Sequence, residues 1–195
     1  MTDRTDNKIA GFVLKGQMAT QAIENLGAHE QKGGKLTFED VGIKVSLKSL
    51  SPDKVEAATK MAAVYIAIAS FENMTRELIS NRLLEEKGAN WWESCVSADI
   101  QKRARTRREE EEKIRWHKAR GLSPIFFAEL NDLILIIQQN WGCFEDLFHN
   151  LDWARQIIKT LERSRNVIMH SGDLSVEDIE RVGMNIRDWV RQIGA

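Results

Sequence analysis

The chain has 195 residues and a mass of 22.3 kDa, which predicts one domain with a sizeable core and room for a terminal extension. Its 28 basic and 29 acidic residues leave a net charge of -1, which excludes a wholly basic nucleic-acid coat and an acidic tail protein. The absence of a long apolar run, the polar start and the count of only 2 Cys exclude a transmembrane span, a secretory signal and a disulfide scaffold. We therefore expect a cytoplasmic protein that makes no contact with a membrane.

The first 50 residues are expected to form an extension ahead of a helical domain that covers residues 51–195. Apolar residues at helical spacing predict a helix over residues 9–28 of this extension. After a pair of glycines, apolar and polar residues alternate over residues 36–47, which indicates a short β-hairpin or an extended arm.

A long helix is predicted to open the helical domain. Ser51-Pro52 is a helix-start signal, because the hydroxyl can cap the first turn and proline lacks only an N–H that would be unpaired there. The helix should run to about Lys87 and end at Gly88. Residues 61–71 are almost wholly apolar, so we expect this helix to lie at the centre of the core, buried on all sides.

Four further helices are predicted from composition, apolar spacing and capping signals. Their ranges are a highly charged helix over about 97–120, an apolar helix over 125–141, and two amphipathic helices over 152–170 and 175–192. Little of the chain has the pattern of a strand, so the expected fold class is an all-α bundle.

One segment near the end of the 152–170 helix combines residue types suited to chemistry. Arg163, Asn166 and His170 share a helix face at i, i+3 and i+7, and Arg165 lies beside that face. A histidine at a helix C-terminus can be partly protonated and can act as a general acid or base near neutral pH. Arginine can neutralise a phosphate, and asparagine can orient a phosphate oxygen or a ribose hydroxyl.

This set, with no recognisable metal ligands, fits RNA cleavage in which the 2′-OH of the RNA is the nucleophile. The alternative is a set of solvated or salt-bridged arginines and a histidine that only caps the helix.

The hexapeptide from Arg165 to His170 resembles the R-x(4–6)-H motif of the HEPN superfamily (higher eukaryotes and prokaryotes nucleotide-binding). It is most similar to the branch named for the HEPN domain of the yeast nuclear transcript-surveillance endonuclease. The resemblance covers roughly residues 60–193. Its surroundings in this chain are Phe71-Glu72, Trp91-Trp92, Asn140-Trp141, Leu161-Glu162 and Asp188-Trp189.

The resemblance implies a HEPN-like helical bundle that forms a homodimer, with a composite active site in a cleft shared by the two late helices. It implies a metal-independent endoribonuclease without a cofactor, which acts on RNA in a toxin, phage-defence or RNA-turnover role and can have an antitoxin or other protein partner. Many members are non-catalytic modules that bind a nucleotide, RNA or protein. A non-catalytic binding module and a purely structural adaptor are therefore the alternatives to an enzyme.

Carried over by resemblance, His170 is the acid and base, Arg165 stabilises the phosphate and transition state, and Asn166 is the positioning residue. Arg163 also satisfies the spacing, but Arg165 is preferred because a polar Asn follows it; Arg163 is then a residue that binds the RNA backbone. Toxins that a partner nucleotidyltransferase modifies are expected to have Tyr two residues after the His. Here that position is Gly172, so we do not expect that partner.

Glu72 lies in the apolar part of the long helix, where a buried carboxylate needs a partner. Arg76, one turn along the helix, is one choice. By resemblance the partner is instead Arg165 or Arg163, which Glu72 would orient. An exposed Glu72 is the remaining alternative.

A basic run extends from Lys102 to Arg120 and is the best candidate for a surface that follows RNA phosphates. Arg107, Arg108 and Arg115 are the RNA-binding candidates within it. The alternative is a solvated helix stabilised by i,i+4 pairs such as Glu109–Lys113.

Overall fold

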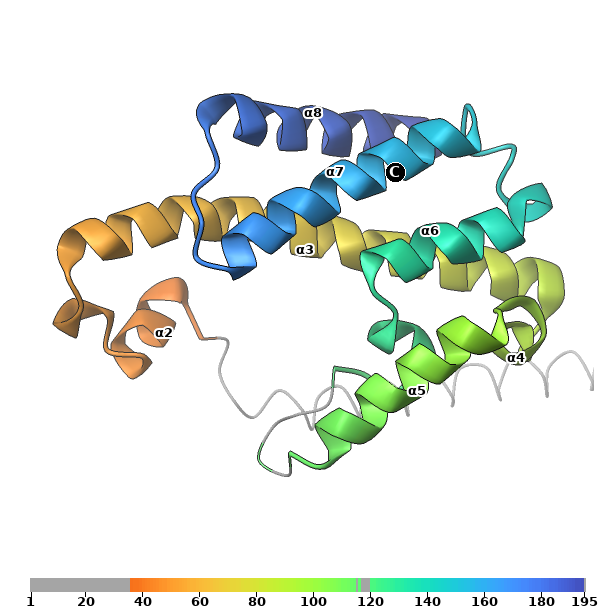
Figure 1. Ribbon diagram of the computed structural model, residues 1–195, viewed down its shortest axis with the longest axis horizontal. Helices are drawn as coiled ribbons and strands as arrows, with labels where there is room; N and C mark the ends of the chain where they lie inside the picture. Colours follow the sequence, from red (N-terminus) through yellow and green to blue (C-terminus); the bar gives the residue numbers. More distant parts are fainter. Residues whose placement is uncertain (1–35, 115, 117–119, 195) are drawn as a thin grey trace, which may run out of the picture. The chain divides into compact units, whose positions relative to one another are not determined.

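The computed structural model describes residues 36–114, 116 and 120–194 (Figure 1). The helix predicted over residues 9–28 lies outside these residues. The chain divides into two units, Met1–Val55 and Glu56–Ala195. Every regular element of the described residues is an α-helix or a 3₁₀ helix, so the prediction of an all-α fold is confirmed. No helix in the described part of the chain combines the length and apolar character needed to cross a bilayer.

The described residues of the first unit contain a short helix where we had predicted a hairpin. Helix α2 covers Phe38–Lys44, and a 3₁₀ turn, η1, covers Leu47–Ser49. The Thr37 hydroxyl accepts a hydrogen bond from the Asp40 N–H at 3.1 Å, and the Asp40 carboxylate accepts one from the Thr37 N–H at 2.8 Å. This reciprocal capping box satisfies backbone donors at the helix start, which an alternating apolar pattern does not reveal.

Helix α3 covers Pro52–Lys87 and confirms the predicted long helix, which ends before Gly88 at a φ of 80°. Its buried positions follow one stripe of the helix. The expectation of burial on all sides is wrong, because Tyr65 is 40% exposed and Ile66 is 60% exposed. The stripe consists of Met61, Val64, Ile68, Phe71, Glu72, Thr75, Ile79 and Leu83.

The middle of the chain departs from the predicted helix bounds at two places. The elements are α4 (Trp91–Cys95), α5 (Ala98–Glu112), η2 (Pro124–Phe127) and α6 (Leu130–Gln139). The charged helix therefore ends at Glu112, and the apolar helix begins at Leu130 after a 3₁₀ turn. Glu129 and Asp132 form a capping box that begins α6, in which the Glu129 N–H donates to the Asp132 carboxylate at 3.2 Å.

The late helices confirm their predicted positions within about two residues. The elements are η3 (Trp141–Cys143), α7 (Leu151–Met169) and α8 (Val176–Ile193). Helix α7 packs between α6 and α8 (Figure 1). The fully buried Trp189 of α8 lies with its ring centroid 5.1 Å from Phe71 of α3 and 6.0 Å from Trp153 of α7. These aromatic contacts hold the three helices together and thereby fix α7 against α3.

Candidate functional site at the end of helix α7

The last turn of α7 places His170 at the helix cap. Its N–H donates to the Asn166 carbonyl at 3.1 Å and the Val167 carbonyl at 3.2 Å. Ser171 follows with a φ of 60° and donates to the Ile168 carbonyl at 3.0 Å. These bonds satisfy carbonyls that the end of a helix would leave unpaired. The histidine backbone is thus fixed, while the side chains of His170 and Asn166 are exposed.

Gly172 completes this turn through close contact with the helix. Its N–H donates to the Val167 carbonyl at 2.9 Å. A Cβ atom at this position would lie 2.8 Å from Cγ1 of Val167 and 3.0 Å from its carbonyl oxygen. A side chain here would therefore force the turn to shift, so the two-residue spacing from His170 is closed to a tyrosine in this conformation.

Glu72 and Arg165 meet between α3 and α7, although 93 positions separate them in the chain. Glu72 is 8% exposed, so the alternative of an exposed Glu72 is wrong. Its Oε2 lies 3.3 Å from Nη1 of Arg165, whose side chain is 21% exposed. The arginine is therefore partly open to solvent and anchored at one nitrogen, and its remaining N–H donors can bind an anion.

Arg76 binds the other oxygen of the same carboxylate. Its Nη2 lies 2.5 Å from Oε1 of Glu72 and also donates to the Ala128 carbonyl at 2.9 Å. Both candidate kinds of partner for Glu72, the neighbour on its own helix and an arginine of the motif helix, are thus present together. One buried negative charge is shared by two guanidinium groups.

Arg163 is arranged differently from Arg165. It is exposed and has no ion-pair or hydrogen-bond partner among the described residues. The side chains of the motif therefore have two surroundings: Arg165 turns toward α3, whereas Arg163, Asn166 and His170 face solvent. Arg165 and His170 thus lie five positions apart at the end of α7, with the guanidinium held toward α3 and the histidine exposed.

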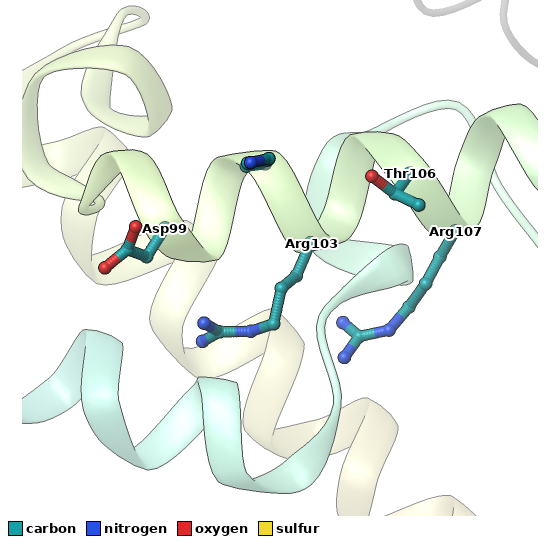
Figure 2. A pocket seen from close by; sticks show the side chains of 5 residues that line it. Asp99, Arg103, Thr106 and Arg107 are labelled. Carbon is teal, nitrogen blue, oxygen red and sulfur yellow. The ribbon is translucent and has the colours of Figure 1, made fainter.

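Three arginines of the basic run on α5 form ion pairs, and they are Arg103, Arg107 and Arg108. Arg103 and Arg107 point from α5 toward α6 (Figure 2). Their Nη2 and Nη1 atoms lie 2.6 Å and 2.8 Å from the two carboxylate oxygens of Asp132. Arg107 also donates to the Phe127 carbonyl at 2.9 Å. With Asp99, Lys102 and Thr106 these arginines line a shallow hollow on α5 (Figure 2).

Asp132 is 3% exposed and is the buried charged residue of α6. Arg103 and Arg107 both pair with it. Its burial disfavours the ionised form, but the hydrogen bonds from Arg103 and Arg107 outweigh burial and lower the pKa of the Asp132 carboxyl below its usual range. This cluster holds α5 against the start of α6. It is not in contact with Glu72.

The other basic candidates lie on the surface or outside the described residues. Arg108 pairs with Glu112 at 2.8 Å, and both side chains are about half exposed. This is an i,i+4 pair of the kind expected for a solvated helix, although it joins Arg108 and Glu112 and not Glu109 and Lys113. Arg115 lies outside the described residues.

Sequence reasoning missed Arg103 and Asp132. Asp132 was detectable as a lone carboxylate in the otherwise apolar run of α6, which requires a buried partner. Nothing in the composition of α5 distinguishes its buried arginines from its exposed ones. Among the described residues, no three His, Cys, Asp or Glu side chains are grouped so as to hold a metal ion.

Comparison with protein families identifies a match to a family model described as Swt1-like HEPN over residues 67–194. The matched range contains Glu72, Arg76, Arg165 and His170, and it includes most of α3 and all the later helices. Comparisons with curated proteins and with solved structures gave no match.

Proposed function

The chain belongs to the Swt1-like HEPN family, and from this membership we propose that it is a metal-independent endoribonuclease of a toxin, phage-defence or RNA-turnover system. The observation that carries the proposal is the buried carboxylate of Glu72, which holds Arg165 on the same helix whose last turn presents His170. A guanidinium that is held in place and keeps free N–H donors is suited to binding a phosphate.

In the proposed reaction the ribose 2′-oxygen attacks the adjacent phosphorus and the bond to the 5′-oxygen breaks. The products are a 2′,3′-cyclic phosphate and a 5′-hydroxyl, so the 2′-OH proton is lost and the leaving oxygen gains one. His170 transfers protons as a general acid or base, a role worth about 10²- to 10⁴-fold in rate. Arg165 stabilises the charge that develops on the phosphate, and Asn166 positions the phosphate or the ribose.

We further propose that two copies of the chain form the active site together. Exposed apolar side chains lie at the end of α7 and the start of α8, where Met169 is 61% exposed and Val176 67%, and Ile66 of α3 is 60% exposed. The Leu174 N–H lies 3.3 Å from Sδ of Met61, so the connection between α7 and α8 lies against α3. Apolar side chains gathered near a polar site favour a partner surface over free exposure to water. An antitoxin or other protein inhibitor would reach the same surface.

The test is cleavage of single-stranded and structured RNA by the purified protein in EDTA, beside His170→Ala and Arg165→Ala. Matched controls are His149→Ala, an exposed histidine near Trp153, and Arg155→Ala, an arginine of α7 paired with Asp152. We expect cyclic phosphate ends, loss of cleavage in the first two variants and wild-type rates in the controls.

Cleavage that the two site variants retain would overturn the assignment of the site. A folded dimer that binds RNA without cleaving it would favour the alternative, a non-catalytic HEPN module that binds a nucleotide, RNA or protein partner.

A further inference from the structure

Arg76 lies outside the motif but joins the site through Glu72. The two oxygens of the Glu72 carboxylate are divided between two helices: Oε1 lies 2.5 Å from Nη2 of Arg76 on α3, and Oε2 lies 3.3 Å from Nη1 of Arg165 on α7. Because Nη2 of Arg76 is also anchored to the Ala128 carbonyl at 2.9 Å, Arg76 holds the carboxylate from one side, and the second carboxylate oxygen lies toward Arg165.

We propose that Arg76 is a positioning residue for Arg165 that acts through Glu72; this inference rests on the proposed ribonuclease function. A carboxylate with two free oxygens can bind one guanidinium with two parallel hydrogen bonds. Arg76 occupies one oxygen and leaves Arg165 a single contact. Removal of Arg76 would let Glu72 hold Arg165 through both oxygens and draw the guanidinium away from the phosphate.

Arg76 is itself fixed from two further directions. Its Nη2 donates to the carbonyl of Ala128 at 2.9 Å, and its Nη1 donates to Oδ1 of Asn73 at 2.9 Å. Ala128 is fully buried in an extended backbone conformation just before α6, so no helix supplies a donor for its carbonyl. The arginine is therefore anchored to the connection between η2 and α6, which gives Glu72 a rigid support.

One nitrogen of Arg76 is left without a partner. Its Nε is buried and has no hydrogen-bond acceptor among the described residues. A buried unpaired donor is unfavourable, because it has lost its hydrogen bond to water. Arg76 is therefore held in the structure through its two terminal nitrogens.

The test compares Arg76→Met with Arg82→Met in single-turnover and steady-state cleavage of RNA. Arg82 is a matched control on the same helix, because it also binds a carbonyl, that of Cys143 at 2.7 Å, and a carboxylate, that of Asp146 at 2.6 Å. Both variants are expected to lower the Tm. Only Arg76→Met is expected to lower kcat, by about 10- to 100-fold, with KM changed less than about threefold.

A double-mutant cycle with Glu72→Gln shows whether Arg76 acts through the carboxylate. In the Glu72→Gln protein, the further substitution Arg76→Met should lower kcat by less than about twofold, because the carboxylate that links Arg76 to Arg165 is already absent. Arg76→Lys, which keeps a cation near the carboxylate, should restore part of kcat and supplies the measurement if the methionine variant does not fold.

Three outcomes are distinguishable. A wild-type protein that cleaves no RNA overturns the proposed function and this inference with it. An active wild type with kcat unchanged in Arg76→Met overturns the inference and leaves the function standing. An effect of Arg76→Met that persists undiminished beside Glu72→Gln shows a structural role and also overturns it.

Discussion

Two buried carboxylates in the described part of this protein are each held by two arginines, and the two clusters differ in which helices supply the arginines. Glu72 is bound by Arg76 and Arg165, and Asp132 is bound by Arg103 and Arg107. Both carboxylates are less than one-tenth exposed. By composition alone the two clusters are alike.

Their geometry separates them. The arginines of Asp132 come from the same helix, one turn apart, and the carboxylate also accepts the Glu129 N–H that begins α6. The ion pairs of the Asp132 cluster join α5 to α6. The arginines of Glu72 come from two different helices, and one of them, Arg165, keeps a single contact at 3.3 Å. The clusters therefore differ in which helices supply the arginines, two helices at Glu72 and one at Asp132. Exposure alone does not separate them, since the Arg103 side chain is 43% exposed and that of Arg165 is 21% exposed.

The largest expected effect comes from removing one arginine from each cluster. Arg165→Ala should lower kcat/KM for RNA by about 10²- to 10³-fold, because a charge-stabilising donor is lost from the transition state. Arg103→Ala should lower the Tm and leave kcat within a few-fold, since Arg103 contacts only Asp132 among the described residues. Cleavage kinetics at a temperature where both variants are folded would check this. Equal losses of activity would erase the distinction between the clusters.

A smaller effect, on stability, is expected at the second cluster. Asp132→Asn removes the charge that faces two guanidinium groups and should lower the free energy of unfolding at pH 7 by about 2–3 kcal/mol. Urea unfolding monitored by circular dichroism measures the difference.

The stability difference between wild type and Asp132→Asn should depend on pH. The Asp132 carboxyl has a lowered pKa in the folded protein, so its stabilising contribution is present above the pKa of the unfolded chain and is lost as the pH falls through the lower pKa of the folded protein. The difference between wild type and Asp132→Asn should therefore narrow in acid. A difference that stayed constant from pH 7 to about pH 3 would show that the carboxylate charge is not what stabilises the contact.

Local signals in the sequence predicted the helices that position the site. Ser51-Pro52 and Gly88 bound α3, and Ser175 caps α8, where its hydroxyl accepts the Asp178 N–H at 3.2 Å. Such signals work because capping bonds join residues three or four positions apart. The same rule explains the failure at α2, where the Thr37 box was hidden by an alternating apolar pattern that had no sheet to join.

The pairing of charges could not be predicted in the same way. The sequence limited the partners of Glu72 to Arg76, Arg163 or Arg165, but the choice depends on which face of α7 meets α3. That is settled by the packing of Trp189 against Phe71 and Trp153, far along the chain. The end of α5 and the 3₁₀ turn before α6 also depend on tertiary contacts, which override composition.

The smallest expected effect on stability is at Arg108, whose exposed ion pair can be compared with the two buried clusters. Its pair with Glu112 is exposed, so Arg108→Ala should change the free energy of unfolding by less than about 0.5 kcal/mol, unlike either buried cluster. If α5 follows RNA phosphates, the same substitution weakens RNA binding of a His170→Ala background and reduces the slope of log affinity against log salt by about one unit. Filter binding over a salt series separates the two cases. An unchanged slope would show that the exposed arginine is solvated surface, and that the basic side of α5 serves the Asp132 cluster and not RNA.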